Sequence, residues 1–174
     1  MMTSDPLQSD LTHPLSWIIS VAQHLDDTSA VSNDFRTELD SHAASIVAGR
    51  NVHVLRDSGR TVDVGPFTES LGKLKRIPVV DCAIAHDCPY SGTTRVMILY
   101  NALHIKEMNH NLLPPFVVRR KGNILNDIPK MQVQDPSVED HSIFFPNDDV
   151  RIPLQLIDTI SYFSLRKPTH DELT

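Results

Sequence analysis

Apolar residues along the chain fall mostly into short runs rich in β-branched side chains, separated by proline, glycine and polar clusters. Ile77 to Ala85 alternates weakly, and Thr93 to Ile105 is dominated by β-branched and large apolar residues. The turn formers Cys88-Pro89-Tyr90-Ser91-Gly92 separate the two runs, so the pattern predicts a long β-hairpin. This succession of short strands and turns predicts a small all-β domain.

A second hairpin is predicted ahead of the first. Val52 to Leu55 and Thr61 to Val64 flank Asp57-Ser58-Gly59, which has the composition of a tight turn. The stretch from Gly65 to Gly72 follows and is again rich in turn formers. Its pattern fits an ordinary surface connection and a functional loop equally well.

The N-terminal part of the chain differs from the rest. Residues 1–33 are predicted to form a lead with one short amphipathic helix, because apolar residues between Leu15 and Leu25 recur at helical spacing. The main domain is expected over residues 34–133, and residues 134–174 are expected to form a C-terminal extension with terminal strands. The helical face consists of Trp17, Ile18, Val21, Ala22 and Leu25.

Asp40 stands out as a candidate catalytic group. It follows a strand-like run that ends at Leu39, and small residues after it lead into a second predicted strand, Ala44 to Ala48. A strand-to-turn junction presents a carboxylate on a rigid framework, where it can serve as a general base that activates water. A second carboxylate brought close would split the two ionisations and supply an acid as well as a base.

Composition narrows the functional classes. The chain has 174 residues, is 40% hydrophobic and carries a formal net charge of −6. This size allows a substantial core, and the negative charge disfavours nucleic-acid binding. No apolar run reaches the length of a membrane span, and Met1 to Asp10 lacks the features of a signal peptide, so we expect an intracellular, cytoplasmic protein without a membrane partner.

Cys82, His86 and Cys88 invite a metal-binding interpretation. A closed zinc site needs four ligands, and no second pair of suitable spacing follows these three residues. The simpler interpretation is that Cys82 packs in a strand while His86 and Cys88 lie in or beside a turn. Two cysteines are too few for a disulfide framework and fit a reducing compartment.

Three segments together resemble the protease region of copia-type retrotransposon polyproteins. The first is Glu38-Leu39-Asp40-Ser41-His42-Ala43, which is similar to the Asp-(Ser/Thr)-Gly-(Ala/Ser) signature of retroviral-type aspartic proteases. The second runs from Ala102 through Asn111-Leu112-Leu113. The third, Arg151 to Leu156 with Ile160 to Phe163, is similar to the region just after the protease.

The resemblance implies a retropepsin-like monomer with a closed β-barrel, which works as a homodimer with one aspartate per chain. Asp40 would be the catalytic carboxyl and Ser41 would link the two turns across the dimer axis. His42 and Ala43 would shape the site; His42 replaces the usual glycine and could crowd the carboxyl pair. No cofactor or metal is implied, and the substrate would be an extended peptide in the element's own polyprotein.

The resemblance also assigns roles away from the aspartate. Asn111, Leu112 and Leu113 would pack under the catalytic turn, although a generic core predicts the same burial. Gly65 to Gly72 would be a flap over the substrate, or a loop beside one. Asp57-Ser58-Gly59 is the only literal match to the signature, but its charged hairpin-tip context ranks Asp57 as a turn residue.

Two other functions stay open beside the protease. The first is a catalytically inactive binding or dimerisation module, because Ala44 stands where relatives commonly have an acidic residue. The second, ranked third, is a metal-dependent hydrolase that would combine Asp40 and His42 with a remote histidine. The remote candidates are His53, His86, His104 and His110.

Overall fold

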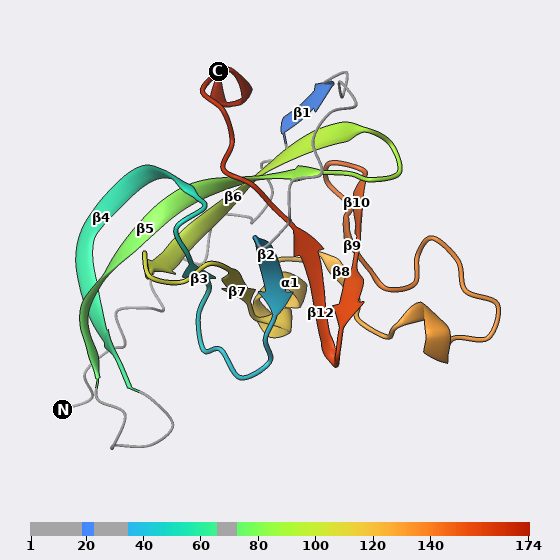
Figure 1. The fold of residues 1–174 in the computed structure, drawn as a ribbon, viewed down its shortest axis with the longest axis horizontal. Helices are drawn as coiled ribbons and strands as arrows, with labels where there is room; N and C mark the ends of the chain where they lie inside the picture. Colours follow the sequence, from blue (N-terminus) through green and yellow to red (C-terminus); the bar gives the residue numbers. More distant parts are fainter. Residues whose placement is uncertain (1–18, 23–34, 66–72) are drawn as a thin grey trace.

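A computed structural model describes residues 19–22, 35–65 and 73–174 of the chain (Figure 1). β-Strands dominate it, as the sequence predicts, and its α-helix is short. The strands are β1 Ile19–Ala22, β2 Arg36–Leu39, β3 Val47–Ala48, β4 His53–Val64, β5 Leu74–Asp87, β6 Thr93–His104, β7 Asn111–Leu113, β8 Ile124–Asn126, β9 Ser142–Phe145, β10 Val150–Pro153, β11 Gln155–Ile157 and β12 Ile160–Ser164. The helices are α1 Pro115–Arg120 and the 3₁₀ turns Lys130–Gln132 and Asp171–Leu173.

The strands form one large and one small sheet. The large sheet has the order β11-β12-β2-β7-β3-β6-β5-β4, with β1 added to β6, and the small sheet has the order β10-β9-β8. The predicted closed barrel is wrong, because no described strand joins the β11 edge to the β4 edge. The strands β4, β5 and β6 are long and strongly curved, so the sheet bends without closing (Figure 1).

The predicted long hairpin is confirmed as β5 and β6, which pair antiparallel from Val79 opposite Leu103 to Asp87 opposite Thr94. The predicted turn at Asp57-Ser58-Gly59 is wrong. These residues lie inside the continuous strand β4, where the register with β5 shifts between Asp57 and Thr61. Gly59 has a φ of +72°, and its N–H donates to the Asp57 carboxylate at 2.8 Å, so a local turn is absorbed as a bulge.

The predicted N-terminal helix is wrong where the structure describes it. Ile19–Ala22 is a strand that pairs antiparallel with the start of β6, with Ile19 opposite Val96 and Ala22 opposite Thr93. The β-branched residues here favour an extended backbone, and the available edge of β6 supplies its hydrogen bonds. The remainder of the predicted helix lies outside the described residues.

The main core lies between the large sheet on one side and α1 with the small sheet on the other. Its largest fully buried side chains include Ile84 of β5, Ile143 of β9, Ile152 of β10 and Phe163 of β12. The helix α1 begins directly at Pro115, the residue after Pro114. Proline is tolerated in the first helical turn because the N–H that it lacks would have no partner there. Within the described part of the chain, no helix is long and apolar enough to cross a membrane.

The segment after β12 is held by a partly buried ion-pair cluster in which the Glu172 carboxylate is buried. Arg166 donates to the Asp87 carboxylate at 2.7 Å and to the Glu172 carboxylate at 2.6 Å, and Thr169 N–H donates to Glu172 at 2.8 Å. Hydrogen bonds from Arg166, opposed by burial, lower the pKa of Glu172 to about 2. The cluster thus fixes the segment to the end of the β5–β6 hairpin.

Candidate functional site

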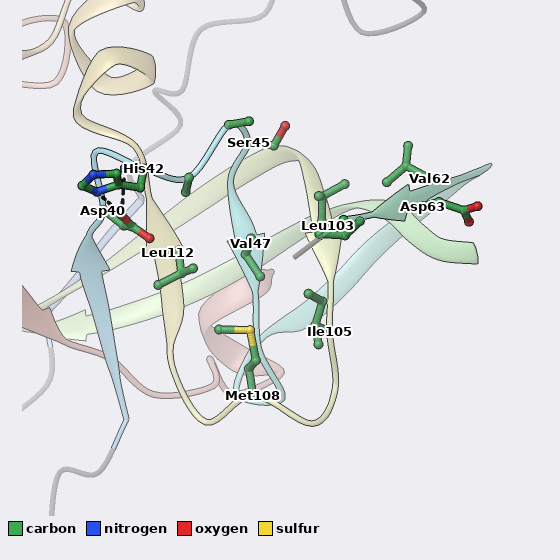
Figure 2. Close-up of a pocket in the computed structure, with 14 residues that line it drawn as sticks. Asp40, His42, Ser45, Val47, Val62, Asp63, Leu103, Ile105, Met108 and Leu112 are labelled. Carbon is green, nitrogen blue, oxygen red and sulfur yellow. Dashed lines mark hydrogen bonds and ion pairs between the residues drawn. The ribbon is translucent and has the colours of Figure 1, made fainter. Parts of the chain in front are cut away.

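Asp40 is the first residue after β2, in the turn that leads to β3 (Figure 2). Its N–H donates to the carbonyl of Leu113 in β7 at 3.2 Å, and its own carbonyl accepts the N–H of Ala43 at 3.3 Å. The predicted second strand is shorter than expected, since only Val47–Ala48 forms β3. The backbone of Asp40 is therefore fixed by a neighbouring strand and by the turn itself.

The Asp40 carboxylate is partly shielded. Its side chain is 33% exposed, and Oδ1 accepts the backbone N–H of His42 at 2.8 Å. The His42 imidazole is 77% exposed, with Nδ1 3.8 Å from the same oxygen and 3.4 Å from the Ser41 hydroxyl. Because the imidazole stands outward, a side chain at this position still lets a backbone amide reach the carboxylate.

The three strands around the turn meet at β7. Leu112 lies opposite Glu38 in the parallel pair with β2 and opposite Val47 in the antiparallel pair with β3. The buried Asn111 side chain ties these strands together, because its Oδ1 accepts the N–H of Gly49 at 2.8 Å and its Nδ2 donates to Thr37 Oγ1 at 3.3 Å. The predicted trio 111–113 thus lies directly beside the Asp40 turn.

Gly49 is required by close packing at the end of β3. A Cβ atom at this position would lie 2.6 Å from the carbonyl oxygen of Met108 and 2.8 Å from that of His110. Both contacts are to backbone, which cannot turn aside as a flexible side chain can. The chain leaving β3 therefore passes against the segment that leads into β7 only because residue 49 lacks a side chain.

An apolar groove of about 540 Å³ extends from Asp40 (Figure 2). Asp40 and His42 lie at one end, and Val62 and Asp63 of β4 lie at the other. Between them the walls are mostly aliphatic, so a carboxylate stands at the head of a surface suited to apolar side chains. The remaining lining residues are Ala43, Ala44, Ser45, Val47, Val64, Gly65, Leu103, Ile105, Met108 and Leu112.

The predicted site residues do not all occupy the groove. Asp40, His42, Ala43 and Leu112 line it, whereas Leu113 is buried in the main core. Ser41 is exposed at the tip of the turn. Of the predicted flap, only Gly65 is described, and it lies at the groove beside the end of β4; residues 66–72 lie outside the described residues.

The Cys82, His86 and Cys88 motif is split by the fold. Cys82 is buried in β5, where burial raises the pKa of its thiol to about 12. His86 is the next-to-last residue of β5, beside the hairpin turn, with Nδ1 2.8 Å from the Ser164 carbonyl, and burial lowers its pKa. Cys88 begins the hairpin turn. Burial raises the pKa of its thiol, but hydrogen bonds with Ser91 outweigh burial, so the pKa of Cys88 is lowered.

Of the four remote histidines considered for a metal site, His110 lies with its Nε2 3.6 Å from Glu38 Oε2, and the other three contact different parts of the fold. His53 and His104 line a separate hollow with Arg50 and Lys106, while His86 packs edge-on against Phe163. Over residues 19–22, 35–65 and 73–174, no group of three or more His, Cys, Asp or Glu side chains could hold a metal ion. The described residues therefore give the metal-dependent hydrolase no ligand set.

Several groove residues were not identified from the sequence. Val62, Leu103, Ile105 and Met108 form the walls with Val47, yet their pattern predicts only strands and core. Alternation within β4 and β6 could have assigned these residues to one face of the sheet. Alternation could not have shown that this face borders Asp40, because β3 pairs with β6, which lies far from it in the sequence.

Comparisons of the chain with protein-family models, curated proteins and solved structures found no match.

Proposed function

We propose that the chain is one half of a homodimeric, retropepsin-like aspartic endopeptidase with Asp40 as its catalytic carboxyl. One observation carries the proposal. Asp40 is held at a strand-to-turn junction by the Leu113 carbonyl, and its carboxylate stands one-third exposed at the head of an apolar groove. Such a carboxyl group is fixed in place and still accessible to water and substrate.

Two copies bring two Asp40 side chains together at a two-fold axis, where they share one proton. The protonated carboxyl hydrogen-bonds to the scissile carbonyl oxygen and transfers its proton to that oxygen as the diol forms, and takes a proton back when the diol collapses. The ionised one accepts a proton from water, whose oxygen attacks the carbonyl carbon and forms a tetrahedral diol. Collapse of the diol breaks the C–N bond, and a proton from the carboxyl pair goes to the departing amine.

The substrate is an extended peptide that lies along the groove with apolar side chains against Val47, Leu103 and Ile105. Each of these residues is buried or lines the apolar wall, so a charged side chain placed there would lose its hydration without gaining a partner. Following the resemblance in the sequence, the natural substrate is a junction in a retrotransposon polyprotein.

The test compares three proteins on a peptide library near pH 5, with the mass of each measured by sedimentation. Asp40→Asn is expected to abolish cleavage and leave the dimer intact. Asp57→Asn is the matched control, because Asp57 belongs to the literal Asp-Ser-Gly sequence but is exposed in the β4 bulge. It is expected to cleave like the wild type.

Each outcome separates this proposal from its alternatives. Cleavage that persists in Asp40→Asn contradicts the proposal. A folded wild-type dimer that cleaves no peptide identifies a binding module instead. Inhibition by a hydroxyl-containing mimic of the tetrahedral diol, with no response to chelators, supports the aspartic mechanism over a metal-dependent one.

A further inference from the structure

The separate hollow that His53 and His104 line is rich in positive charge. It measures about 400 Å³, and three cationic side chains reach it from segments that are far apart in the sequence. Arg50 follows β3, Lys106 follows β6 and Lys167 follows β12. We call this site the cationic hollow. The remaining lining residues are Val52 and Val54.

The segments that carry these charges are held in place. The Arg50 guanidinium donates a hydrogen bond to the side chain of Asn109, which is a neutral partner. Arg166, the neighbour of Lys167, exchanges backbone hydrogen bonds of 2.8 and 2.9 Å with Ala85 on β5. The hollow is therefore formed by backbone that the fold fixes before any ligand binds.

The three cations have no anionic partner in the described part of the chain. No ion pair joins Arg50, Lys106 or Lys167 to a described carboxylate, and no aspartate or glutamate lines the hollow. Other arginines do pair, as Arg56 does with Asp81 at 2.7 Å. The chain has 22 acidic and 16 basic residues, so this gathering of cations is not a result of the overall composition. Like charges held together repel one another, and a bound anion would relieve that repulsion.

The pKa of His104 shows how the nearby charges act. Burial lowers this pKa and Lys106 lowers it further, while Glu107 and Asp57 oppose both effects without reversing them. At pH 7 the imidazole is therefore neutral and offers one N–H donor rather than a charge. The positive charge of the hollow comes from the arginine and the two lysines, which stay protonated at this pH.

Phosphate oxygens suit this arrangement better than carboxylates do. Cations that converge from three segments match an anion that carries several charges on a few neighbouring oxygens. The guanidinium fork fits phosphate geometry, and each lysine adds a point charge. The carboxylates of an acidic peptide are instead spread along an extended chain at about 3.3 Å per residue. The volume of the hollow also lies within the range of small-molecule sites.

We propose that the cationic hollow binds the di- or triphosphate group of a small molecule. Arg50, Lys106 and Lys167 contact the phosphate oxygens, and His104 donates its N–H. This site is additional to the proposed function, because it shares no lining residue with the groove at Asp40. Leu103 of the groove and His104 of the hollow are successive residues of β6, so they point to opposite faces of the sheet.

Calorimetric titration of the full chain with inorganic triphosphate, in a buffer without divalent cations, tests the site. Wild type is expected to give a single-site isotherm. Lys106→Gln and Lys167→Gln are each expected to bind about tenfold more weakly, because each loses one charge-assisted contact. Both lysines are exposed, and circular dichroism checks that the variants are folded. Lys130→Gln is the matched control, because it removes the same charge from an exposed lysine outside the hollow, and it is expected to bind like the wild type.

Two further ligands test the chemistry and its source. Citrate, a carboxylate anion, is expected to bind at least about tenfold more weakly than triphosphate. ATP that binds more tightly than triphosphate identifies a nucleotide whose nucleoside contacts Val52 and Val54. ATP that binds no more tightly identifies the polyphosphate group alone as the recognised part.

Three results would overturn the site. They are the absence of triphosphate binding to the wild type, equal binding of citrate and triphosphate, and a loss in Lys130→Gln as large as that in Lys106→Gln. Asp40→Asn is expected to bind triphosphate like the wild type, because Asp40 lies outside the hollow. A failure of the protease proposal therefore leaves this result unchanged, and the reverse also holds.

Discussion

Asn111→Ala tests whether the Asp40 turn depends on one buried side chain. Asn111 accepts from the Gly49 N–H at 2.8 Å and donates to Thr37 Oγ1 at 3.3 Å. These two contacts connect β7 with β2 and with the segment after β3. Alanine at position 111 removes the side-chain amide, so the Gly49 N–H and the Thr37 hydroxyl stay buried and lose this hydrogen-bond partner.

The expected loss in the free energy of unfolding follows from the Gly49 N–H and the Thr37 hydroxyl. A buried donor or acceptor left without a partner costs about 1–3 kcal/mol. The Thr37 hydroxyl can rotate toward another acceptor, so we place the total loss in the free energy of unfolding at about 2–4 kcal/mol. Such a loss is a large fraction of the stability of a typical domain.

Urea unfolding followed by circular dichroism measures the loss. With a slope of about 2 kcal/mol per molar urea, the unfolding midpoint of Asn111→Ala is expected to fall by about 1–2 M. Asn109→Ala is the control, because Asn109 is exposed and hydrogen-bonds only across the surface to Arg50 among its described contacts. Its expected change is within about 0.5 kcal/mol. Equal midpoints for the two variants would refute the role given to Asn111.

Three further predictions concern stability and thiol chemistry. The folded-state pKa of Glu172 is about 2 against an ordinary 4.5, so its pairing with Arg166 contributes fully above about pH 4.5 and is lost as pH falls toward 2. Glu172→Gln is therefore expected to lower the free energy of unfolding at pH 7 by about 3 kcal/mol. The free energy of unfolding of the variant should also fall less steeply between pH 4.5 and pH 2, as measured by urea titrations from pH 7 to pH 2. Gly49→Ala is expected to destabilise the fold by more than about 3 kcal/mol, and a melting temperature equal to that of the wild type would contradict the close backbone contact. Iodoacetamide at pH 7 is expected to modify Cys88 and spare the buried Cys82, so mass spectrometry should find one adduct on the folded chain and two in denaturant.

The pattern of apolar residues and turn formers predicted the long hairpin, in which each strand pairs with the next strand in the sequence. The β5–β6 hairpin was predicted because both runs and the turn between them are contiguous in the sequence. Asp57-Ser58-Gly59 has the same turn composition, yet β5 provides a partner on both sides of it and carries β4 straight through as one strand. Residues 19–22 show the same effect, since pairing with β6 overrides a helical spacing.

The candidate site was predicted in part for a similar reason. Asp40 and the 111–113 segment could be found because short motifs mark them. The groove could not be found, since its walls come from β3, β4 and β6 and meet only through tertiary pairing. A second hollow, to which Asp40, Thr159 and Ile160 contribute, was missed because these residues meet only through the antiparallel pairing of β12 with β2.

That pairing also orders events during synthesis. β2 is made early, but its antiparallel neighbour β12 emerges only after every other strand of the large sheet. Contacts between such distant segments close a very long loop, and they form late because the entropy of that loop must be overcome first. Until β12 has paired, the edge of β2 beside Asp40 has no strand on that side.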